Sequence, residues 1–342
     1  MYASSAALLL ATPVLAQSKV SLAFRDSVPA WLAASHVPGM TVAVIENGKV
    51  THTQAFGVLR RGVPMTPRAL FNVASLTKPV VAVTTLRLAS AKRLSLDAPL
   101  DPDWIDPDIQ SDPRHAKLTA RIVLSHQTGF PNWRRSMPRK KLGFLFDPGT
   151  RFGYSGEGFE YLRQALEHKY KTSLPQLADS ILFKPLGMTE TTFGWNPQVD
   201  TLRFAIGHDT NGVAIASGMR TTARPSAADW LVTTVGDYSR FGEFVLKGAG
   251  LSAAKFADMT KPQVQMEGKP NEAMGLGWEV MKGPPGDPTI LLHTGSDEGI
   301  KTMIVLLPAS KRGIVLFTNG ERGMDVIVRV LKSSLHMKEL TP

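Results

Sequence analysis

The sequence contains no cysteine, and this absence excludes several kinds of site together. Disulfide bonds, zinc sites with thiolate ligands, iron–sulfur clusters and cysteine nucleophiles all need that side chain. A metal site would have to use histidine and carboxylate ligands only. Charged residues make up only 20% of the 342 residues, and hydrophobic residues make up 43%. These values are typical of globular proteins, so disordered, collagen-like and coiled-coil classes are excluded.

Acidic residues are fewer than basic residues in this sequence. Asp and Glu number 29 against 39 Lys and Arg, which gives a formal net charge of +10. A basic protein favours anionic surroundings such as nucleic acid, a membrane surface or an acidic polymer. No aromatic–basic motif typical of nucleic-acid binding accompanies the charge, so we expect no nucleic-acid partner. A chain of this length can bury a large core, as one large domain or two ordinary ones.

Residues 3–16, ASSAALLLATPVLA, form an apolar run without charge. The run is shorter than the about 20 residues that a membrane-spanning helix needs. It ends in Val14-Leu15-Ala16, which resembles a small-residue cleavage site, and we interpret residues 1–16 as a secretory signal peptide. No Lys or Arg precedes the run, so a frayed N-terminus is the alternative. The prediction places the mature protein in the periplasm or outside the cell, without stable membrane insertion.

Strand patterns occur near both ends of the chain, and helical patterns lie between them. Residues 41–57 have the pattern of two strands around Asn47-Gly48, a strong hairpin signal. Three apolar runs near the C-terminus indicate further antiparallel strands, followed by an amphipathic helix at about 323–335. We therefore expect an α/β protein of the α+β type. Its antiparallel sheet would be built from both chain ends and flanked by helices, with an inserted, mainly helical lobe.

The segment Ser75-Leu76-Thr77-Lys78 has the spacing of a serine nucleophile activated by a lysine. Pro79 has no N–H and is tolerated only in the first turn of a helix, so the helix begins near Ser75. Residues i and i+3 share one helix face, which lets the hydroxyl and the amine meet. A lysine whose pKa is lowered by burial can act as the base for such a serine.

The same spacing occurs at Ser252 and Lys255. About one S-x-x-K is expected by chance in a chain of this length, so spacing alone carries little information. The second copy follows LKGAGL and lacks the extended FNVA that precedes Ser75. We interpret it as an ordinary helix start and prefer Ser75 because of its context.

A second motif, Tyr154-Ser155-Gly156, lies in FDPGTRFGYSGEGF. Pro and Gly punctuation indicates a rigid loop before a helix, from which the phenol could lie beside Ser75 and accept its proton. A packed loop tyrosine is the alternative. The run also lacks the last glycine of the G-x-S-x-G elbow, so an α/β-hydrolase is not favoured.

A third motif, His293-Thr294-Gly295, stands at the expected end of a strand. Gly295 has no side chain and would let a substrate backbone approach closely. An edge strand at this place could pair with an extended substrate. It would also offer the N–H of Ser296, which together with the N–H of Ser75 would form an oxyanion hole.

The order and context of these motifs resemble the superfamily of serine β-lactamases and penicillin-binding proteins. The branch that looks nearest is the class C β-lactamases with their esterase and D-aminopeptidase relatives. Further stretches that resemble this branch are 64–79, 93–100, 122–131, 146–156, 182–193 and 274–280. The resemblance covers about 40–335. It implies one catalytic domain over 17–342, with an α/β part at about 17–74 and 265–342 and a helical part at about 75–264.

The resemblance implies a mechanism for these residues. Ser75 would attack an acyl carbon, Lys78 and Tyr154 would move protons, and the N–H groups of Ser75 and Ser296 would hold the oxyanion. Water would release the acyl-enzyme, and no metal or cofactor would be needed. The substrate would be a small ester or amide or a cell-wall peptide. Which of Lys78 and Tyr154 is the base stays open, because two such groups titrate as a coupled pair.

Three departures from the class C pattern bear on the substrate. Gly156 stands where an Asn is usual, His293 where a Lys is usual, and Trp133 near a position where a Gln is common. An imidazole, mostly neutral at pH 7, holds a substrate carboxylate less well than a permanent cation. The residues expected to border the substrate are His293, Thr294, Gly295, Gly156 and Trp133.

These departures favour a serine hydrolase acting on carboxylic esters or amides. A class C β-lactamase, or a D-Ala or D-amino-acid peptidase, is the alternative within the same chemistry. A penicillin-binding cell-wall sensor with little turnover is the alternative of another class. A cluster of cations at Arg134, Arg135, Arg139, Lys140 and Lys141 could steer anionic substrates or rest on anionic lipid, although a solvated loop is the simpler interpretation.

Overall fold

A computed structural model describes residues 20–195, 199–215 and 225–335 of the protein. The expected signal peptide at residues 1–16 lies outside the described residues and stays a prediction. Within the described part, no helix is both long enough and apolar enough to cross a membrane.

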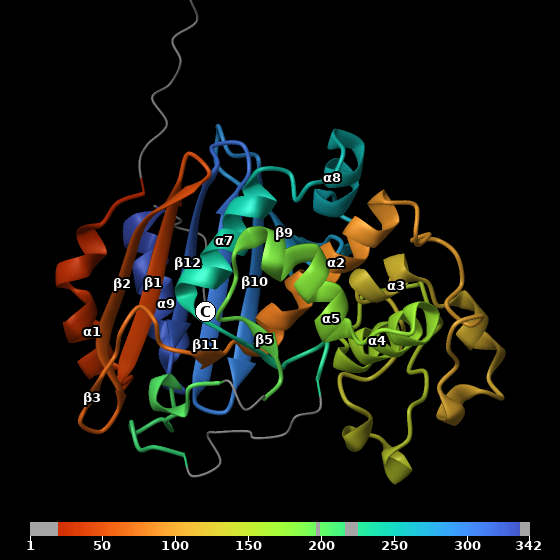
Figure 1. The fold of residues 1–342 in the computed structure, drawn as a ribbon, viewed down its shortest axis with the longest axis horizontal. Helices are drawn as coiled ribbons and strands as arrows, with labels where there is room; N and C mark the ends of the chain where they lie inside the picture. The colour runs from red at the N-terminus through yellow and green to blue at the C-terminus, as the bar shows by residue number, and fades with distance from the viewer. Residues whose placement is uncertain (1–19, 196–198, 216–224, 336–342) are drawn as a thin grey trace, which may run out of the picture.

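A nine-stranded sheet forms the centre of the fold, with the strand order β3-β2-β1-β12-β11-β10-β9-β8-β7 (Figure 1). Each adjacent pair is antiparallel. The N-terminal strands are β1 (Gly39–Glu46), β2 (Lys49–Arg60) and β3 (Val63–Pro64). The C-terminal strands are β7 (Val264–Gln265), β8 (Glu272–Met274), β9 (Glu279–Lys282), β10 (Thr289–Asp297), β11 (Ile300–Leu307) and β12 (Arg312–Thr318). Because β1 pairs with β12, the expectation of a sheet built from both chain ends is confirmed.

The β1–β2 hairpin turns at Asn47 and Gly48, which both have positive φ, 52° and 69°. Two successive left-handed residues make the tight turn that suits the twist of a hairpin, and Asn-Gly adopts it readily. The Asn-Gly signal in the sequence therefore located this turn.

The alternation of side chains along β1 gives the sheet two buried faces. Val42 and Val44 belong to one core cluster, whereas Ala43 and Ile45 belong to another. On the first face the sheet packs against α1 (Val28–Ala34), the 3₁₀ turn η1 (Ala23–Asp26) and α9 (Gly323–Ser334). The helix expected at about 323–335 thus covers the sheet, as the sequence predicted.

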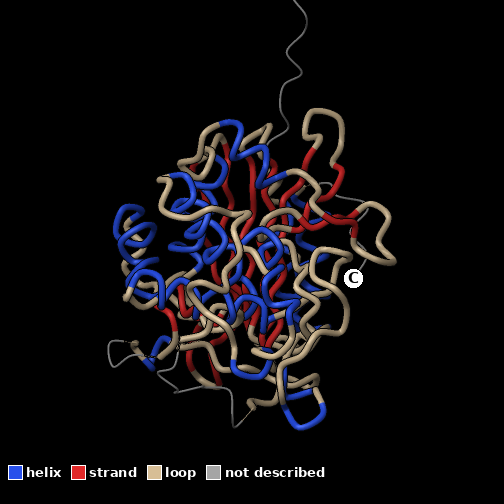
Figure 2. The backbone as a smooth tube through the Cα atoms, turned by 90° about the vertical axis from the view of Figure 1, so that its right-hand side faces the viewer, coloured by secondary structure: helices blue, strands red, loops and turns tan. Residues whose placement is uncertain are grey.

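On the second face lie α7 (Val235–Leu246) and the helical lobe. The lobe is on the right in Figure 1 and faces the viewer in Figure 2. Its helices are α2 (Thr77–Ser90), α3 (Ala120–Leu124), α4 (Gly156–Tyr170), α5 (Leu174–Ala178), α6 (Lys184–Leu186) and α8 (Ala253–Thr260). Short 3₁₀ turns are η2 (Ala74–Leu76), η3 (Pro107–Ile109), η4 (Pro113–Lys117), η5 (Arg134–Ser136), η6 (Pro138–Lys140) and η8 (Thr201–Arg203). The segment η7 (Asp179–Phe183) is a π-helical turn between α5 and α6.

The middle of the chain is less uniformly helical than the sequence suggested. Helix α7 falls within the expected helical part at 75–264, yet it packs on β1 and β12 of the main sheet. A small sheet with the order β4-β6-β5 also joins β4 (Phe71–Asn72) to two strands from the middle, β5 (Thr192–Phe193) and β6 (Leu231–Thr233).

Helix α2 is buried on nearly all sides and forms the centre of the helical lobe. Hydrophobicity all round a helix is what such a position requires.

Candidate active site

Ser75 lies in the 3₁₀ turn η2, between strand β4 and helix α2. The preceding residue, Ala74, has a φ of +49°, a backbone conformation that is costly for a residue with a Cβ. Two side chains hold this turn: Asn72 Oδ1 accepts from the N–H of Ala74 at 3.1 Å, and Thr302 Oγ1 on β11 donates to the carbonyl of Val73 at 3.0 Å. The nucleophile segment is therefore fixed to the sheet before the helix begins.

Lys78 lies in the first turn of α2, and its side chain meets Ser75. Its Nζ donates to Ser75 Oγ at 3.0 Å and to the carbonyl of Ala228 at 2.7 Å. The Lys78 side chain is 1% exposed. Its hydrogen bond to Ala228 is buried, and its hydrogen bond to the half-buried Ser75 is partly buried. Hydrogen bonds to charged or polarised groups are strong when they are shielded from water.

Tyr154 reaches the same oxygen from the loop before α4. Its hydroxyl donates to Ser75 Oγ at 2.8 Å, and Lys78 Nζ lies 4.8 Å from the centre of its ring. The loop is held by Ser155, whose Oγ donates to the carbonyl of Pro131 at 2.8 Å and caps α4 by accepting from the N–H of Gly158 at 2.9 Å. The structure thus brings Ser75, Lys78 and Tyr154 together from segments that are 79 residues apart in the chain.

The third motif lies within strand β10, rather than at its end as the sequence suggested. Strand β9 pairs with residues 289–292 only, whereas β11 pairs with the strand as far as Asp297. The second half of β10, which carries Thr294 and Ser296, therefore has a strand on one side only within the described part of the chain. Ser296 is exposed and Thr294 is half-buried.

Gly295 brings this strand against the nucleophile. A Cβ at position 295 would lie 2.3 Å from the carbonyl oxygen of Val73, 2.1 Å from Thr302 Oγ1 and 3.4 Å from the nitrogen of Ser75. The glycine is thus required by the protein's own backbone, which corrects the expectation that its purpose is to admit a substrate. Because Ser296 follows Gly295, it lies next to the segment that contains Ser75. The two N–H groups predicted to form the oxyanion hole, those of Ser75 and Ser296, therefore belong to neighbouring segments.

His293 is buried, which corrects the expectation that its side chain borders the substrate. It is 1% exposed, and its Nδ1–H donates to the carbonyl of Thr294 at 2.8 Å. Burial, together with the positive charge of Lys78, lowers the pKa of His293 to about 3. The imidazole is therefore neutral at neutral pH, so it supplies no cation to the site.

Trp133 occupies the space beside Gly156. A Cβ at position 156 would lie 2.9 Å from Trp133 Cη2, so the indole fills the place that a larger second-motif residue would need. The N–H of Gly156 donates to Asn132 Oδ1 at 2.9 Å. Trp133 also lines a cavity of about 580 Å³ with Arg135 of η5 and with Glu160 and other polar residues of α4.

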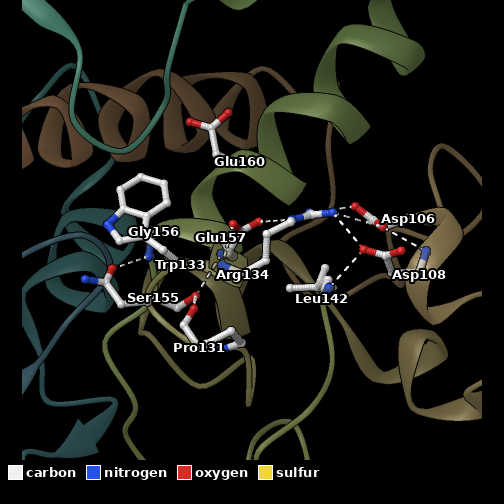
Figure 3. Close-up of polar contacts among 12 residues, drawn as sticks. Asp106, Asp108, Pro131, Trp133, Arg134, Leu142, Ser155, Gly156, Glu157 and Glu160 are labelled. Atoms are coloured by element: carbon white, nitrogen blue, oxygen red, sulfur yellow. Dashed lines mark hydrogen bonds and ion pairs between the residues drawn. The ribbon is translucent and has the colours of Figure 1, made fainter. Parts of the chain in front are cut away.

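Arg134 fixes the backbone beside Trp133, and Figure 3 shows its partners. Its guanidinium reaches Asp106 at 2.8 Å, Asp108 at 3.1 Å and Glu157 at 2.9 Å, and its backbone N–H donates to Glu157 Oε1 at 2.8 Å. This cation of the basic cluster is therefore neutralised within the fold. The other four, Arg135, Arg139, Lys140 and Lys141, are exposed.

Sequence reasoning missed several groups that shape the site. Asn72 and Thr302 hold the nucleophile turn, and the Ala228 carbonyl binds Lys78. Asn72 could have been suspected, because an asparagine two residues before a turn often bonds to the backbone. A backbone carbonyl such as that of Ala228 leaves no signal in the sequence.

Among the described residues, no group of three or more His, Asp or Glu is arranged to hold a metal ion.

Comparison with known proteins identifies the family. The sequence model of the family described as Beta-lactamase matches residues 24–331, so the chain belongs to the beta-lactamase family. This finding confirms the resemblance drawn from the three motifs.

Curated relatives are distant in sequence. The chain is 23% identical over 312 residues to Protein flp of Staphylococcus aureus (strain MRSA252), covering 84% of this chain and 60% of that protein. It thus spans about three fifths of that relative's length. It is also 23% identical to Penicillin-binding protein 4* of Bacillus subtilis (strain 168), covering 90% of this chain and 73% of that one.

Solved structures share the fold. The D-amino acid amidase from Ochrobactrum anthropi SV3, complexed with L-phenylalanine, has a TM-score of 0.74 at 22% identity, covering 91% of this chain and 98% of that one. The octameric penicillin-binding protein homologue from Pyrococcus abyssi also has a TM-score of 0.74, at 20% identity, covering 92% and 78%. The D-alanine carboxypeptidase AmpC from Burkholderia cenocepacia has the same TM-score at 20% identity, covering 91% and 99%. The expected fold class is therefore confirmed.

Proposed function

We propose that the protein is a serine hydrolase that forms an acyl-enzyme on Ser75 from carboxylic esters or amides. The observation that carries the proposal is the convergence of two proton-bearing groups on one oxygen, with Lys78 Nζ at 3.0 Å and the Tyr154 hydroxyl at 2.8 Å from Ser75 Oγ. A nucleophile and its base within hydrogen-bonding distance, oriented by a third group, are the signature of nucleophilic catalysis. Membership of the beta-lactamase family supports this type of function.

The chemistry follows from this geometry. Ser75 Oγ bonds to the acyl carbon as its proton passes to whichever of Lys78 and Tyr154 is unprotonated, and the oxygen of the former carbonyl takes the negative charge. The same pair then returns a proton to the departing alcohol or amine. Water then attacks the acyl carbon and gives a proton to the same pair. The bond from that carbon to Ser75 Oγ breaks, Oγ takes the proton back, and the acid is released. The N–H groups of Ser75 and Ser296 are our candidates for binding the oxyanion.

The character of the substrate is inferred from position 293. A neutral, buried His293 gives strand β10 no cation at that place with which to hold a carboxylate beside the scissile bond. We therefore propose that the preferred esters and amides lack that carboxylate. β-Lactams and peptides ending in D-Ala carry it, so we expect them to react poorly.

A substrate panel tests the proposal. Purified protein would be assayed with p-nitrophenyl esters of short acids, a D-amino-acid amide and a chromogenic cephalosporin, beside Ser75→Ala. Ser252→Ala is the matched control, because it removes the serine of the other S-x-x-K. We expect ester turnover that is lost in Ser75→Ala and kept in Ser252→Ala.

Each contrary outcome has a distinct meaning. Ester turnover that persists in Ser75→Ala would contradict the nucleophile. Cephalosporin hydrolysis faster than that of every ester would replace the proposed substrate class with β-lactams. Stable labelling of Ser75 without release would indicate a penicillin-binding sensor.

We also propose that the protein is exported and acts in the periplasm or outside the cell, which rests on the apolar run at residues 3–16. N-terminal sequencing of the protein recovered from its native source would test this. A mature chain beginning near Gln17 is expected, whereas an intact Met1 would contradict the proposal.

A further inference from the structure

His126 is a buried residue that the proposed chemistry does not use. It follows α3, is 0% exposed and has a φ of +54°, a backbone conformation that few residues with a Cβ adopt. Such conformations persist where the surrounding structure enforces them, and they cluster at functional sites. Its neighbours explain what enforces it.

Three contacts join His126 to the loop that carries Tyr154. The carbonyl of His126 accepts from the N–H of Gly153 at 2.8 Å, and its Nδ1 accepts from the N–H of Ser155 at 3.0 Å. Its ring stacks on the ring of Tyr154, with the centres 4.3 Å apart and the planes 26° apart. The residue before Tyr154, the residue after it and its own ring are thus all held by one histidine.

The second of these bonds fixes the form of the imidazole. Nδ1 can accept from Ser155 only while it carries no proton, so the ring hydrogen is on Nε2. Burial lowers the pKa of His126 well below its ordinary value, and the nearby Lys78 and His293 lower it further. Phe159 of α4, with its ring centre 5.2 Å away, encloses another side of the imidazole. The neutral, hydrogen-bond-accepting form is therefore the one that this pocket favours.

We propose that His126 is a positioning residue that holds the Tyr154 hydroxyl at Ser75. This inference rests on the proposed serine-hydrolase function. The Tyr154 hydroxyl donates to Ser75 Oγ at 2.8 Å, so its position must be held accurately. A shift of a catalytic group by about 1 Å can lower the rate by about 100-fold. His126 is fully buried and is bonded to the loop that carries Tyr154, so it acts through Tyr154.

Two substitutions separate the two side-chain contacts. His126→Asn keeps an acceptor near Nδ1 and loses the ring, whereas His126→Phe keeps the stacked ring and loses the acceptor. We expect each to lower kcat for a p-nitrophenyl ester by about 10- to 100-fold with KM little changed. The matched control is His208→Asn, which alters a histidine that is also buried and bonded through Nδ1, to the carbonyl of Asn319 at 2.9 Å. This control should keep kcat.

A double-mutant cycle distinguishes positioning from general structural support. In a Tyr154→Phe background, the His126 substitutions should lower kcat by less than about 2-fold, because the hydroxyl that they position is gone. An equal fold-loss in both backgrounds would overturn the proposal, as would unchanged kcat in the single variants. Absence of Ser75-dependent turnover in the wild type would instead contradict the proposed function.

A spectroscopic measurement tests the positioning without any turnover. The chain has five tyrosines, so ring signals of ¹³C-labelled tyrosine can be assigned by comparison with Tyr154→Phe. In both His126 variants we expect the Tyr154 signal to shift and the other tyrosine signals to stay. An unmoved Tyr154 signal would overturn the proposal, and if one variant fails to fold, the other still decides.

Discussion

The chain contains the spacing S-x-x-K at two places, and the structure treats them differently. At Ser75 and Lys78 the buried amine meets the half-buried hydroxyl at 3.0 Å. At Ser252 and Lys255 it does not: Lys255 Nζ turns away and donates to the carbonyl of Ala89 at the end of α2, at 2.8 Å. The same four-residue pattern therefore brings a lysine to a serine in one region, whereas in the other it only begins a surface helix.

The backbone explains the difference. Ser75 already lies within a helical turn, so positions i and i+3 share a face. Ser252 is the N-cap of α8, with an extended backbone at φ −65° and ψ 158°, and its Oγ accepts from the N–H of Lys255 at 3.4 Å. A capping serine is turned toward the backbone and is not available to a lysine side chain. The spacing therefore brings the two side chains together where the serine lies within a helical turn, as Ser75 does in η2, and not where it caps the helix, as Ser252 does.

Removing the two amines should affect activity very differently. Lys78→Ala should lower kcat/KM for a p-nitrophenyl ester by about 10²–10⁴-fold, because it removes a group that moves protons in the reaction. Lys255→Ala removes only a hydrogen bond to Ala89 and should leave kcat/KM unchanged. Steady-state kinetics of both variants would check this. Equal losses in the two would contradict the distinction between the regions.

Removing the Tyr154 hydroxyl should lower activity less than removing the Lys78 amine. Tyr154→Phe keeps the ring and deletes the hydroxyl that donates to Ser75, so kcat should fall by about 10²-fold. Tyr170→Phe is the control, since its hydroxyl donates to the carbonyl of Arg93 at 2.8 Å, at an exposed position. Full activity in Tyr154→Phe would show that Lys78 alone serves Ser75.

The burial of His293 should affect how the stability of the fold depends on pH in the acid range. The pKa of His293 is about 3 in the folded protein, against 6.5 in an ordinary histidine, so the unfolded chain binds a proton that the folded chain does not. The resulting stability is present above about pH 6.5 and is lost as the pH falls toward 3. Between pH 7 and pH 5, the wild type should lose about 2 kcal/mol more unfolding free energy than His293→Gln.

Urea unfolding at the two pH values would measure that difference. Groups other than His293 are present in both proteins, so only the difference between wild type and His293→Gln is informative. Equal losses in the two proteins would mean that His293 takes up its proton in the folded state. Lys255→Ala should leave the pH dependence unaltered, because it removes only a hydrogen bond to Ala89.

The smallest effect expected is on stability alone. Ser252→Ala removes a helix cap and should lower the free energy of unfolding by about 1 kcal/mol without changing kcat/KM. Ser75→Ala should abolish activity yet cost little or no stability, because functional polar groups are rarely placed for stability. Thermal unfolding combined with ester kinetics would check both serines. The reverse pattern would exchange the roles that we assign to them.

The sequence was informative where local chemistry determines structure. Asn47-Gly48 specified a hairpin, and Pro79 limited where α2 can begin, so Ser75 and Lys78 could be placed on one helix face. The convergence with Tyr154 came from the resemblance of the motifs, since no local rule joins positions 79 residues apart.

The remaining features depend on tertiary contacts. The burial of His293, the fit of Gly295 against Val73 and the indole of Trp133 over Gly156 arise where distant segments pack. Helix α7 has an amphipathic pattern that would suit either half of the protein, and only the fold shows that it covers the sheet. These are the same features that most alter the expected substrate site.

The proposed function of Ser75 depends most directly on which atom becomes acylated. The protein would be mixed with a slowly hydrolysed p-nitrophenyl ester, quenched in acid during turnover, digested and mapped by mass spectrometry. We predict one acyl group per chain, on the peptide that contains Ser75, and none on the peptide with Ser252. Turnover without an adduct at Ser75, or an adduct at another residue, would contradict the account.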